Sequence, residues 1–574
     1  MKSSDAIAKV LSANNVTVGF ELIGGMIAHL VDSINLLSET RLISVHHEQA
    51  AAFAAGGIAR ATKNNQLGLA LATSGPGATN LVTGIADCWL DNYPCIFITG
   101  QVNSHELKGD RNIRQQGFQE LDIVSVVKSI TKYAVQIKSP DELITELQKA
   151  IDISISGRPG PVLIDIPMDI QRSELSDNVL DYLNVRKKND LRVSIDKCQS
   201  TLNQFEEVLY CLSKAEKPLF IIGGGAVNES SFIEWQEYIS QLNIPYVASL
   251  KGSEKTSSLN GYFGLIGAYG TRTANYAIQN ADLIIVLGSR LDIRQTGADV
   301  NDFARLAKNI IQIDIDKAQL NNRVKGQVNI NARCEQFFSI HMSRKNEKNI
   351  EESQWFNEIK KQWCQTFKNE YEELAISPFN LCMSLSKGFK GKPAQFVTDV
   401  GNNQMWVAHS LLLDRKQMLH HSGGLGAMGF AIPTSIGIHY ATNENVVSIS
   451  GDGGAQLNIQ ELDIIAREEL PILTIIVNNE SLGMVRAFQE MYFEGRNQST
   501  YWKGYSSSFV DIAKAYNMNA TLIETEKEFD IALLSFIENP SPALLEINMR
   551  DARECKPRLA FGNPIDQQYP NRND

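Results

Sequence analysis

A carboxylate and an amide occupy matching positions after two apolar runs of the chain. Val446–Ser450 is short and rich in β-branched residues, and it leads directly into Gly-Asp-Gly with Asp452 at its centre. A second apolar run, Ile472–Val477, ends in an asparagine pair that includes Asn479. If both runs are parallel strands, these side chains meet at the edge where open α/β sheets bind ligands. Carboxylate and amide oxygens suit Mg²⁺, so the pattern predicts a site for Mg²⁺ and a diphosphate, with a structural turn as the alternative.

Composition limits the classes of protein to consider. The 574 residues exceed the size of one core, so two to four domains are expected. A net charge of −11, from 54 basic and 65 acidic residues, argues against nucleic acid or an anionic membrane as partner. The eight cysteines form no Cys-x-x-Cys pair, and nowhere do 18 apolar residues run together. We therefore expect reduced thiols, no membrane span and a cytoplasmic location.

The chain alternates strand-like and helical segments in three blocks, which favours an α/β fold with parallel sheets. Charged segments at 186–196 and 344–352 read as connections. The sequence predicts three doubly wound domains and a polar C-terminal tail, bounded as 1–185, 190–345, 360–550 and 551–574.

The Gly-Asp-Gly motif around Asp452 resembles the diphosphate anchor of thiamine diphosphate (ThDP) enzymes, in which Gly-Asp-Gly and Asn-Asn are separated by 24 residues, as they are here. ThDP chemistry also needs a carboxylate bonded to the pyrimidine ring nitrogen. Glu48 closes a predicted strand, Ile43–Val45, and opens an Ala-rich helix, Gln49–Thr62. A charged side chain among small apolar neighbours needs a partner. The alternative is a first-turn glutamate favoured by the helix dipole.

Further motifs resemble the acetolactate synthase family over nearly the whole chain. They include His-Glu-Gln-x-Ala-Ala from His47, Thr-Ser-Gly-Pro-Gly-Ala-Thr-Asn from Thr73, Gln-Met-Trp from Gln404, and Ser-Gly-Gly-Leu-Gly-Ala-Met-Gly-Phe from Ser422. The resemblance implies that Glu48 activates the pyrimidine, that Asp452, Asn479 and the Ser481 carbonyl hold Mg²⁺, and that Met428 bends the cofactor. An ordinary core methionine is the alternative for Met428. The implied ThDP-binding residues are Glu48, Pro76, Asn80, Val400, Gly401, Asn402, Asn403, Gly426, Met428, Gly451, Asp452, Gly453, Gly454, Asn479, Ser481, Leu482, Gly483, Met484 and Val485.

The middle block is similar to the FAD-binding domain of this family. A glycine triplet after the predicted strand Leu219–Ile222 is weak evidence alone, and the family context strengthens it. Ala268-Tyr269 stands where the family usually has Met-His, and Ile293 replaces an acidic residue. The implied FAD, which would be structural, is assigned to Arg158, Gly224, Gly225, Ser249, Leu250, Gly267, Gly270, Ser289, Arg290 and Asp314.

Other positions bear on the substrates. By the resemblance, Gly25 and Gln119 line the reaction space and Arg294 faces the carboxylate of a second 2-oxo acid, although a surface or flavin-adjacent arginine is the alternative. Lys132 is expected to add positive charge nearby. Phe488 stands where the family places a tryptophan against the acceptor, which leaves more room.

The loop between Gln101 and Phe118 is longer than usual and polar, with Lys108, Asp110, Arg111 and Arg114. An enlarged, basic pocket would suit a larger acceptor, as in related flavin-containing carboligases that act on nucleotide-linked keto sugars. A solvated loop without a role in acceptor binding is the alternative.

The resulting prediction is a carboligase dependent on ThDP, Mg²⁺ and FAD. It decarboxylates pyruvate and transfers the two-carbon hydroxyethyl unit to a second 2-oxo acid or to a ketone or keto sugar. The family arrangement implies a homo-oligomer, dimeric or tetrameric, with sites between subunits. One alternative is a 2-oxo-acid decarboxylase that uses a histidine pair, His46-His47 or His420-His421. The other is a non-catalytic homologue.

Overall fold

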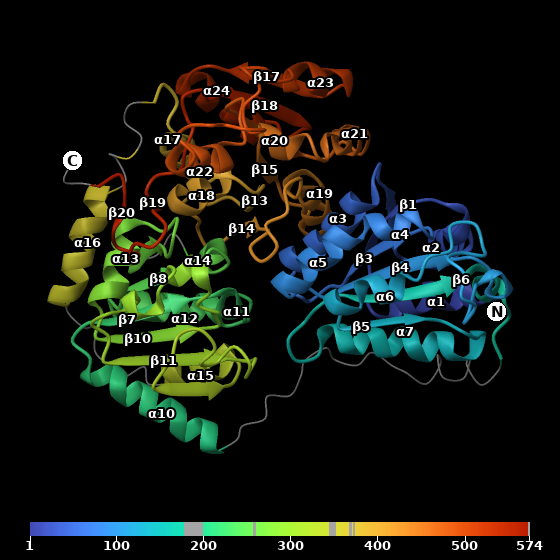
Figure 1. Cartoon of the computed structure of the whole chain (residues 1–574), viewed down its shortest axis with the longest axis horizontal. Coiled ribbons are helices and arrows are strands. Elements are labelled where there is room, and N and C mark those ends of the chain that lie inside the picture. Colours follow the sequence, from blue (N-terminus) through green and yellow to red (C-terminus); the bar gives the residue numbers. More distant parts are fainter. Residues whose placement is uncertain (177–198, 257–259, 344–351, 367–369, 371–373, 572–574) are drawn as a thin grey trace.

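Three parallel sheets of six strands each divide the chain into three α/β domains (Figure 1). The computed structural model describes residues 1–176, 199–256, 260–343, 352–366, 370 and 374–571. The predicted fold class of three domains with parallel sheets is confirmed. The predicted boundaries at residues 185, 190 and 345 lie outside the described residues.

The N-terminal domain has the strand order β2-β1-β3-β4-β6-β5, with apolar clusters on both faces of the sheet. Helix α3 forms because alanine is the strongest helix former, and the His47 ring caps it by accepting from the Gln49 amide at 3.1 Å. The helices and strands are α1 (Ser3–Ala13), β1 (Val18–Leu22), α2 (Ala28–Leu37), β2 (Arg41–Ser44), α3 (Glu48–Ala61), β3 (Gly68–Ala72), α4 (Pro76–Asn80), α5 (Val82–Asp91), β4 (Cys95–Gln101), α6 (Ile123–Val127), β5 (Tyr133–Gln136), α7 (Pro140–Ile155), β6 (Val162–Pro167) and α8 (Met168–Arg172).

The central domain has the strand order β9-β8-β7-β10-β11-β12. This is the order of dinucleotide-binding sheets, whose ligand crosses the point where the order reverses, here between β7 and β10. The helices and strands are α10 (Gln199–Lys214), β7 (Pro218–Ile222), α11 (Gly224–Val227), α12 (Phe232–Gln241), β8 (Tyr246–Ala248), β9 (Tyr262–Leu265), α13 (Arg272–Asn280), β10 (Leu283–Leu287), α14 (Ile293–Thr296), β11 (Asn309–Asp314), β12 (Val328–Asn331) and α15 (Cys334–Ser343).

The C-terminal domain has the order β14-β13-β15-β16-β18-β17, which repeats that of the N-terminal domain when strands are counted within each domain. The two domains therefore share one topology. The helices and strands are α17 (Pro378–Gly388), β13 (Ala394–Thr398), α18 (Asn402–Ser410), β14 (Gln417–His421), α19 (Ala431–Thr442), β15 (Val446–Gly451), α20 (Asp452–Ala455), α21 (Leu462–Arg467), β16 (Ile472–Asn478), α22 (Gly483–Tyr492), α23 (Phe509–Ala515), β17 (Asn519–Ile523), α24 (Glu526–Glu538) and β18 (Ala543–Asn548).

Helix α16 and the C-terminal tail both pack on the central domain. Helix α16 (Gln354–Thr366) straddles the predicted boundary at residue 360, but Trp355 donates to the Pro218 carbonyl at 3.2 Å and Phe356 joins an apolar cluster of the central domain. The tail forms a small hairpin of β19 (Arg558–Leu559) and β20 (Gln568–Tyr569), which lies beside the central domain (Figure 1).

Helices α3 and α19 pack closely and join the N- and C-terminal domains (Figure 1). A Cβ at Gly437 would overlap the Ala54 carbonyl, and one at Gly57 would lie 2.6 Å from the Thr434 carbonyl. Only glycine permits this approach. A single apolar cluster runs through the interface, so the two domains share part of their core.

Candidate active site

The predicted strands around Asp452 and Asn479 are neighbours in the structure. β15 and β16 pair in parallel with Gly451 opposite Val477, so the two side chains follow adjacent strand ends. Asp452 accepts from the Ser481 amide at 3.0 Å, and burial raises the pKa of its carboxyl to about 6. Asn479 donates its amide group to the Ala552 carbonyl at 2.9 Å, so its side-chain oxygen remains to accept or to ligate.

The donor set fits Mg²⁺. It consists of the Asp452 carboxylate, the Asn479 amide oxygen and the Ser481 carbonyl, which already accepts from the Gly483 amide at 2.8 Å and retains a second lone pair. Within the described part of the chain, no group of three His, Cys, Asp or Glu side chains could hold a metal. A metal at Asp452 would therefore depend on amide, carbonyl and phosphate oxygens, which are the ligands that Mg²⁺ commonly takes.

Glycines of the motif make room for protein side chains. A Cβ at Gly453 would collide with Leu482 and lie 3.5 Å from the Met428 methyl group, and one at Gly454 would collide with Asp399. The resemblance implied that these glycines bind ThDP, and the structure shows that close packing of the protein also requires them. Met428 thus lies near Gly453, and its role in bending the cofactor stays a prediction.

Residues 399–403 add backbone amides and amide side chains to the same edge. Asp399 is buried and accepts from the Val400, Gly429 and Ala431 amides at 2.9, 3.0 and 2.9 Å. Asn403 donates to the Asp399 carbonyl at 2.9 Å, and the Asn402 side-chain oxygen is buried with no partner among the described residues. An unsatisfied buried oxygen is costly, and a donor on a bound ligand or a bound water would supply the missing interaction.

Three other predicted ThDP residues differ in how closely the protein packs around them. A Cβ at Gly426 would meet no atom within 4 Å, and Val485 is 52% exposed. Met484 packs against the apolar cluster of the C-terminal domain.

The Glu48 carboxylate lies at the first residue of α3 and is 5% exposed. It accepts from Asn80 at 2.9 Å. Its other oxygen would lie 3.1 Å from a Cβ at Gly77, so glycine leaves it room. Pro76 begins α4, which carries Asn80. Asn80, which the resemblance gave to ThDP, thus positions Glu48, and its contact with the cofactor stays a prediction.

Gly25 is exposed and Gln119 is partly buried in the N-terminal domain. A Cβ at Gly25 would meet no atom within 4 Å. Gln119 adopts a positive φ of 64° beside Gly75, an uncommon conformation for this residue type. Phe488 on α22 is 50% exposed and packs on Tyr492, with ring centroids 4.7 Å apart.

The hydrogen bonds that hold Glu48 and Asp452 come from their own domains.

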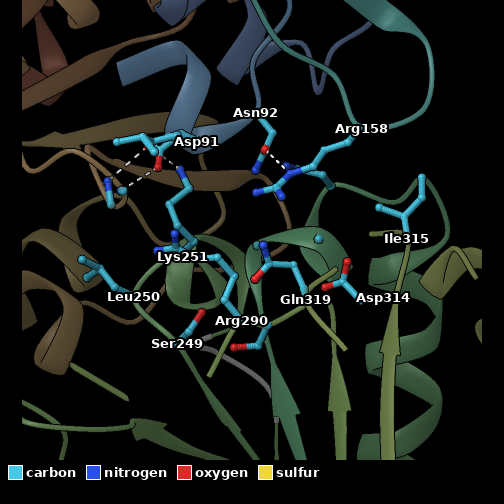
Figure 2. A pocket seen from close by; sticks show the side chains of 18 of the residues that line it. Asp91, Asn92, Arg158, Ser249, Leu250, Lys251, Arg290, Asp314, Ile315 and Gln319 are labelled. Carbon is cyan, nitrogen blue, oxygen red and sulfur yellow. Dashed lines mark hydrogen bonds and ion pairs between the residues drawn. The ribbon is translucent and has the colours of Figure 1, made fainter. Parts of the chain in front are cut away.

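A cavity of about 700 Å³ opens at the carboxyl edge of the central sheet, bordered by all three domains (Figure 2). Its place at the β7–β10 switch point and its size suit a dinucleotide. Eight of the ten predicted FAD residues line it: Arg158, Gly224, Gly225, Ser249, Leu250, Ser289, Arg290 and Asp314. Arg158 extends into the cavity from the N-terminal domain, and its guanidinium donates a hydrogen bond to the Asp316 carboxylate at 2.8 Å.

Three predicted residues occupy other places. Gly267 and Gly270 are not among the cavity-lining residues, and each has backbone atoms where a Cβ would lie, so they shape the 266–271 loop. The Lys132 ammonium donates to the Ser156 carbonyl at 2.6 Å and to the Ile153 carbonyl, which completes the C-terminal end of α7. The structure therefore corrects the expected role of Lys132 as a charge in the site. Arg294 does line the cavity.

The loop before Phe118 is ordered by its own contacts. The Glu120 carboxylate accepts from the backbone amides of Lys108, Gln116 and Gly117 at 2.6, 2.8 and 3.1 Å. Arg111 donates to the Lys108 carbonyl at 2.7 Å, so its side chain stabilises the loop. Phe118 is 81% exposed.

Sequence reasoning missed a buried charge network on the cavity wall. Arg60 on α3 donates to Asp87 at 2.5 Å and to Asp91 at 3.0 Å. From the central domain, Lys251 approaches Asp91 at 3.6 Å and Glu254 at 2.5 Å. Burial alone would favour neutral carboxyls, but Lys251 and Arg60 hold the pKa of Asp91 below its usual value. An arginine in an Ala-rich helix gives no pattern that identifies partners so distant in sequence.

Models of thiamine pyrophosphate enzymes match all three domains. The N-terminal TPP binding domain matches residues 1–126, the central domain 205–339 and the C-terminal TPP binding domain 399–547. The acetolactate synthase large subunit of Cyanidium caldarium is 33% identical over 98% of this chain and 95% of its own length. Acetolactate synthase isozyme 2 large subunit of Escherichia coli is 32% identical over 98% of both chains.

The chain belongs to the acetolactate synthase family. Membership confirms the predicted enzyme class, a ThDP-dependent transferase that forms carbon–carbon bonds. It also fits the geometry of the site, in which the C-terminal TPP binding domain carries Asp452 and Asn479 and the N-terminal one carries Glu48.

The histidines of the two pairs that would have favoured a decarboxylase already take part in structural contacts. His420 and His421 are fully buried at the end of β14, and burial lowers the pKa of both rings. His46 is paired with Asp463 at 2.7 Å at the surface. Among the described residues, no helix is both long and apolar enough to cross a bilayer.

Proposed function

We propose that this enzyme decarboxylates pyruvate and transfers the hydroxyethyl unit to a carbonyl acceptor, with ThDP, Mg²⁺ and a structural FAD. The observation that carries the proposal is the placement of Asp452 and Asn479 at adjacent strand ends, with Glu48 buried at the start of α3. When bound, ThDP supplies the thiazolium that accepts the two-carbon unit. Asp452, Asn479 and the Ser481 carbonyl would hold Mg²⁺, and Glu48 would hold a proton against the pyrimidine nitrogen.

The proposed FAD rests on the cavity at the β7–β10 switch point. Arg158, Arg290 and Ser289 supply donors for phosphate oxygens, and Leu250 with Met405 supplies apolar wall. Carboligation involves no net electron transfer, so the flavin would stabilise the junction of the three domains. The visible absorption spectrum of the purified protein tests the proposal: flavin bands support it, and a colourless protein that gains no flavin on reconstitution overturns it.

We propose a homo-oligomer in which Glu48 of one subunit faces Asp452 of another. Exposed apolar side chains lie on both halves of the site, on the N-terminal domain at Phe118 (81% exposed) and on the C-terminal domain at Val485 and Phe488 (52% and 50%). A second copy would cover these groups, because oligomer interfaces bury such patches.

Mixing two inactive variants tests this arrangement. Glu48→Gln and Asp452→Ala homo-oligomers are each inactive, but a mixed dimer has one site with both changes and one intact site. Random reassociation should therefore restore about a quarter of the activity. Complete inactivity of the mixture would place both halves of each site in a single chain.

Two acceptor classes are supported by different residues. Arg294 at the cavity supports a second 2-oxo acid, since a guanidinium binds carboxylates in a bidentate manner. The half-exposed Phe488 supports a bulkier ketone or keto sugar. Product analysis separates them. Acetolactate accumulating from pyruvate alone favours the first, and turnover that requires an added cyclic ketone or keto-sugar nucleotide favours the second.

A further inference from the structure

One segment of the C-terminal domain, residues 421–428, lies between the two proposed cofactor sites. Near its start, Gly423 and Gly424 line the cavity at the β7–β10 switch point. At its end, the Met428 methyl group lies 3.5 Å from where a Cβ at Gly453 of the Gly-Asp-Gly motif would stand. By the proposed function, a flavin in the cavity and a ThDP molecule would therefore contact opposite ends of one short segment.

The N-terminal domain holds the first half of this segment through two carboxylates of α5. Asp91 accepts from the Gly423 amide at 3.1 Å and from the Gly424 amide at 2.7 Å. Asp87 accepts from the Ser422 hydroxyl at 2.6 Å. Asp87 and Asp91 are buried, so water does not compete for these hydrogen bonds, and each bond is stronger than it would be at the surface.

The central domain holds the same segment from the cavity wall. The Glu254 carboxylate accepts from the His421 amide at 2.9 Å, and the Lys251 ammonium donates to the His421 carbonyl at 3.3 Å. Lys251 also lines the cavity, where its ammonium lies 3.6 Å from the Asp91 carboxylate (Figure 2). A Cβ at Gly423 would lie 2.6 Å from the Lys251 side chain, so the aliphatic part of the lysine packs directly on the segment.

An internal hydrogen bond links the two ends of the segment. The Ala427 amide donates to the Ser422 hydroxyl at 3.1 Å, and that hydroxyl donates in turn to Asp87. Ala427 directly precedes Met428. The Ser422 side chain therefore ties the end of the segment near the diphosphate motif to the part that the N-terminal domain holds.

A ligand in the cavity would restrict the whole segment. It would pack against the backbone of residues 423–424 and against Lys251, which share the cavity wall. The hydrogen bonds of Ser422 would extend this restriction toward Met428. Ordering a segment costs conformational entropy, and a segment that one ligand has already ordered costs less to order when a second ligand binds. The two sites are therefore expected to bind their ligands cooperatively.

We propose that residues 421–428 couple the two cofactor sites, so that FAD in the cavity strengthens the binding of ThDP, and ThDP strengthens the binding of FAD by the same factor. Lys251 and Ser422 act as positioning residues: Lys251 holds the cavity end of the segment, and Ser422 holds the end near ThDP. The inference rests on the proposed ThDP and FAD sites. It gives the flavin a function in an enzyme whose reaction involves no net electron transfer.

Calorimetric titration of the full-length protein, freed of both cofactors, tests this coupling. With Mg²⁺ present, we expect the wild type to bind ThDP about 10-fold more tightly when it is saturated with FAD than without FAD. Lys251→Met and Ser422→Ala should each lower this ratio to less than about 3-fold, whereas Lys251→Arg keeps the charge and should retain most of it. A general loss of stability would weaken ThDP binding equally with and without FAD, so the ratio reports the positioning of the segment.

Arg415→Met is the matched control. Arg415 also joins the C-terminal domain to the central domain, through an ion pair with Glu237 at 3.2 Å, and neither residue lines the cavity. Its ratio should equal that of the wild type. Ser422 is not a cavity-lining residue either, so Ser422→Ala should bind FAD normally even if Lys251→Met does not.

Two results would overturn the inference. One is equal affinity of the wild type for ThDP with and without FAD, and the other is a wild-type ratio in Ser422→Ala. A wild-type protein that binds no ThDP, or that binds no FAD, would instead overturn the proposed function.

Discussion

The ammonium of Lys251 lies 3.6 Å from the carboxylate of Asp91 and joins the central domain to the N-terminal domain at the cavity wall (Figure 2). The same ammonium contacts Glu254 at 2.5 Å and the Tyr93 hydroxyl at 3.2 Å. Asp91 and Glu254 are only 4% and 3% exposed. Because water does not reach these carboxylates, their negative charges depend on Lys251 and Arg60. The ion pairs thereby help to hold the central and N-terminal domains together.

Loss of Lys251 should weaken this junction. Because Lys251→Met leaves buried carboxylates with fewer partners, we expect the free energy of unfolding to fall by about 3 kcal/mol. Denaturant unfolding measures it. Lys149→Met removes an exposed lysine paired with Glu146 and should change the free energy of unfolding far less, because exposed ion pairs contribute little. Equal stability of the two variants would show that the junction does not depend on Lys251.

Glu461 should make stability depend on pH. Burial raises the pKa of its carboxyl to about 7 from 4.5, so the fold favours the protonated form. Its contribution is fully present below pH 4.5 and is lost as the pH rises through 7. Between about pH 5 and about pH 8 the wild type should lose about 2 kcal/mol more stability than Glu461→Gln. Parallel pH dependence of unfolding in the two proteins would contradict this assignment.

Asp452→Asn should prevent binding of ThDP with Mg²⁺. The change removes the one charged oxygen of the proposed ligand set, and we expect affinity to fall at least about 100-fold, the scale of losing a charged partner. Calorimetric titration with ThDP and Mg²⁺ measures it. Asp530→Asn, at an exposed carboxylate on α24, is the control. Unchanged affinity of Asp452→Asn for ThDP and Mg²⁺ would show that the metal does not bind at Asp452.

Phe488→Trp should lower turnover with bulky acceptors. The larger ring fills space at a half-exposed position of α22, so turnover with a bulky cyclic ketone should fall about 10-fold relative to turnover with a 2-oxo acid. Competition between the two acceptors in one reaction gives the ratio directly. An unchanged ratio would show that Phe488 does not contact the acceptor.

The fold was largely predictable where strands are apolar and buried. The predicted strands Val446–Ser450 and Ile472–Val477 agree to within one residue with β15 (Val446–Gly451) and β16 (Ile472–Asn478), since both runs are continuous and buried. β5 (Tyr133–Gln136) was missed because it is an edge strand whose residues are all only partly buried, so no apolar alternation marks it. The C-terminal half of α16 falls in the predicted domain 360–550, although the helix packs on the central domain, because an amphipathic pattern does not identify the surface that it packs against.

The residues of the candidate site could likewise be predicted only in part. Asp452, Asn479 and Glu48 could be found because motif spacing and strand ends identify them. Lys132 could not be placed, since a lysine before a strand gives no sign that its ammonium will cap α7. The contact of Lys251 with Asp91 spans residues from two domains, and only tertiary structure brings them together.

The most direct test is to incubate purified protein, loaded with ThDP and Mg²⁺, with pyruvate labelled at C2 and candidate acceptors, and to follow the products by NMR. We predict CO₂ release with the label in a new carbon–carbon bond, and no reaction for Glu48→Gln. Acetaldehyde as sole product, or full turnover by Glu48→Gln, would contradict the proposed carboligation.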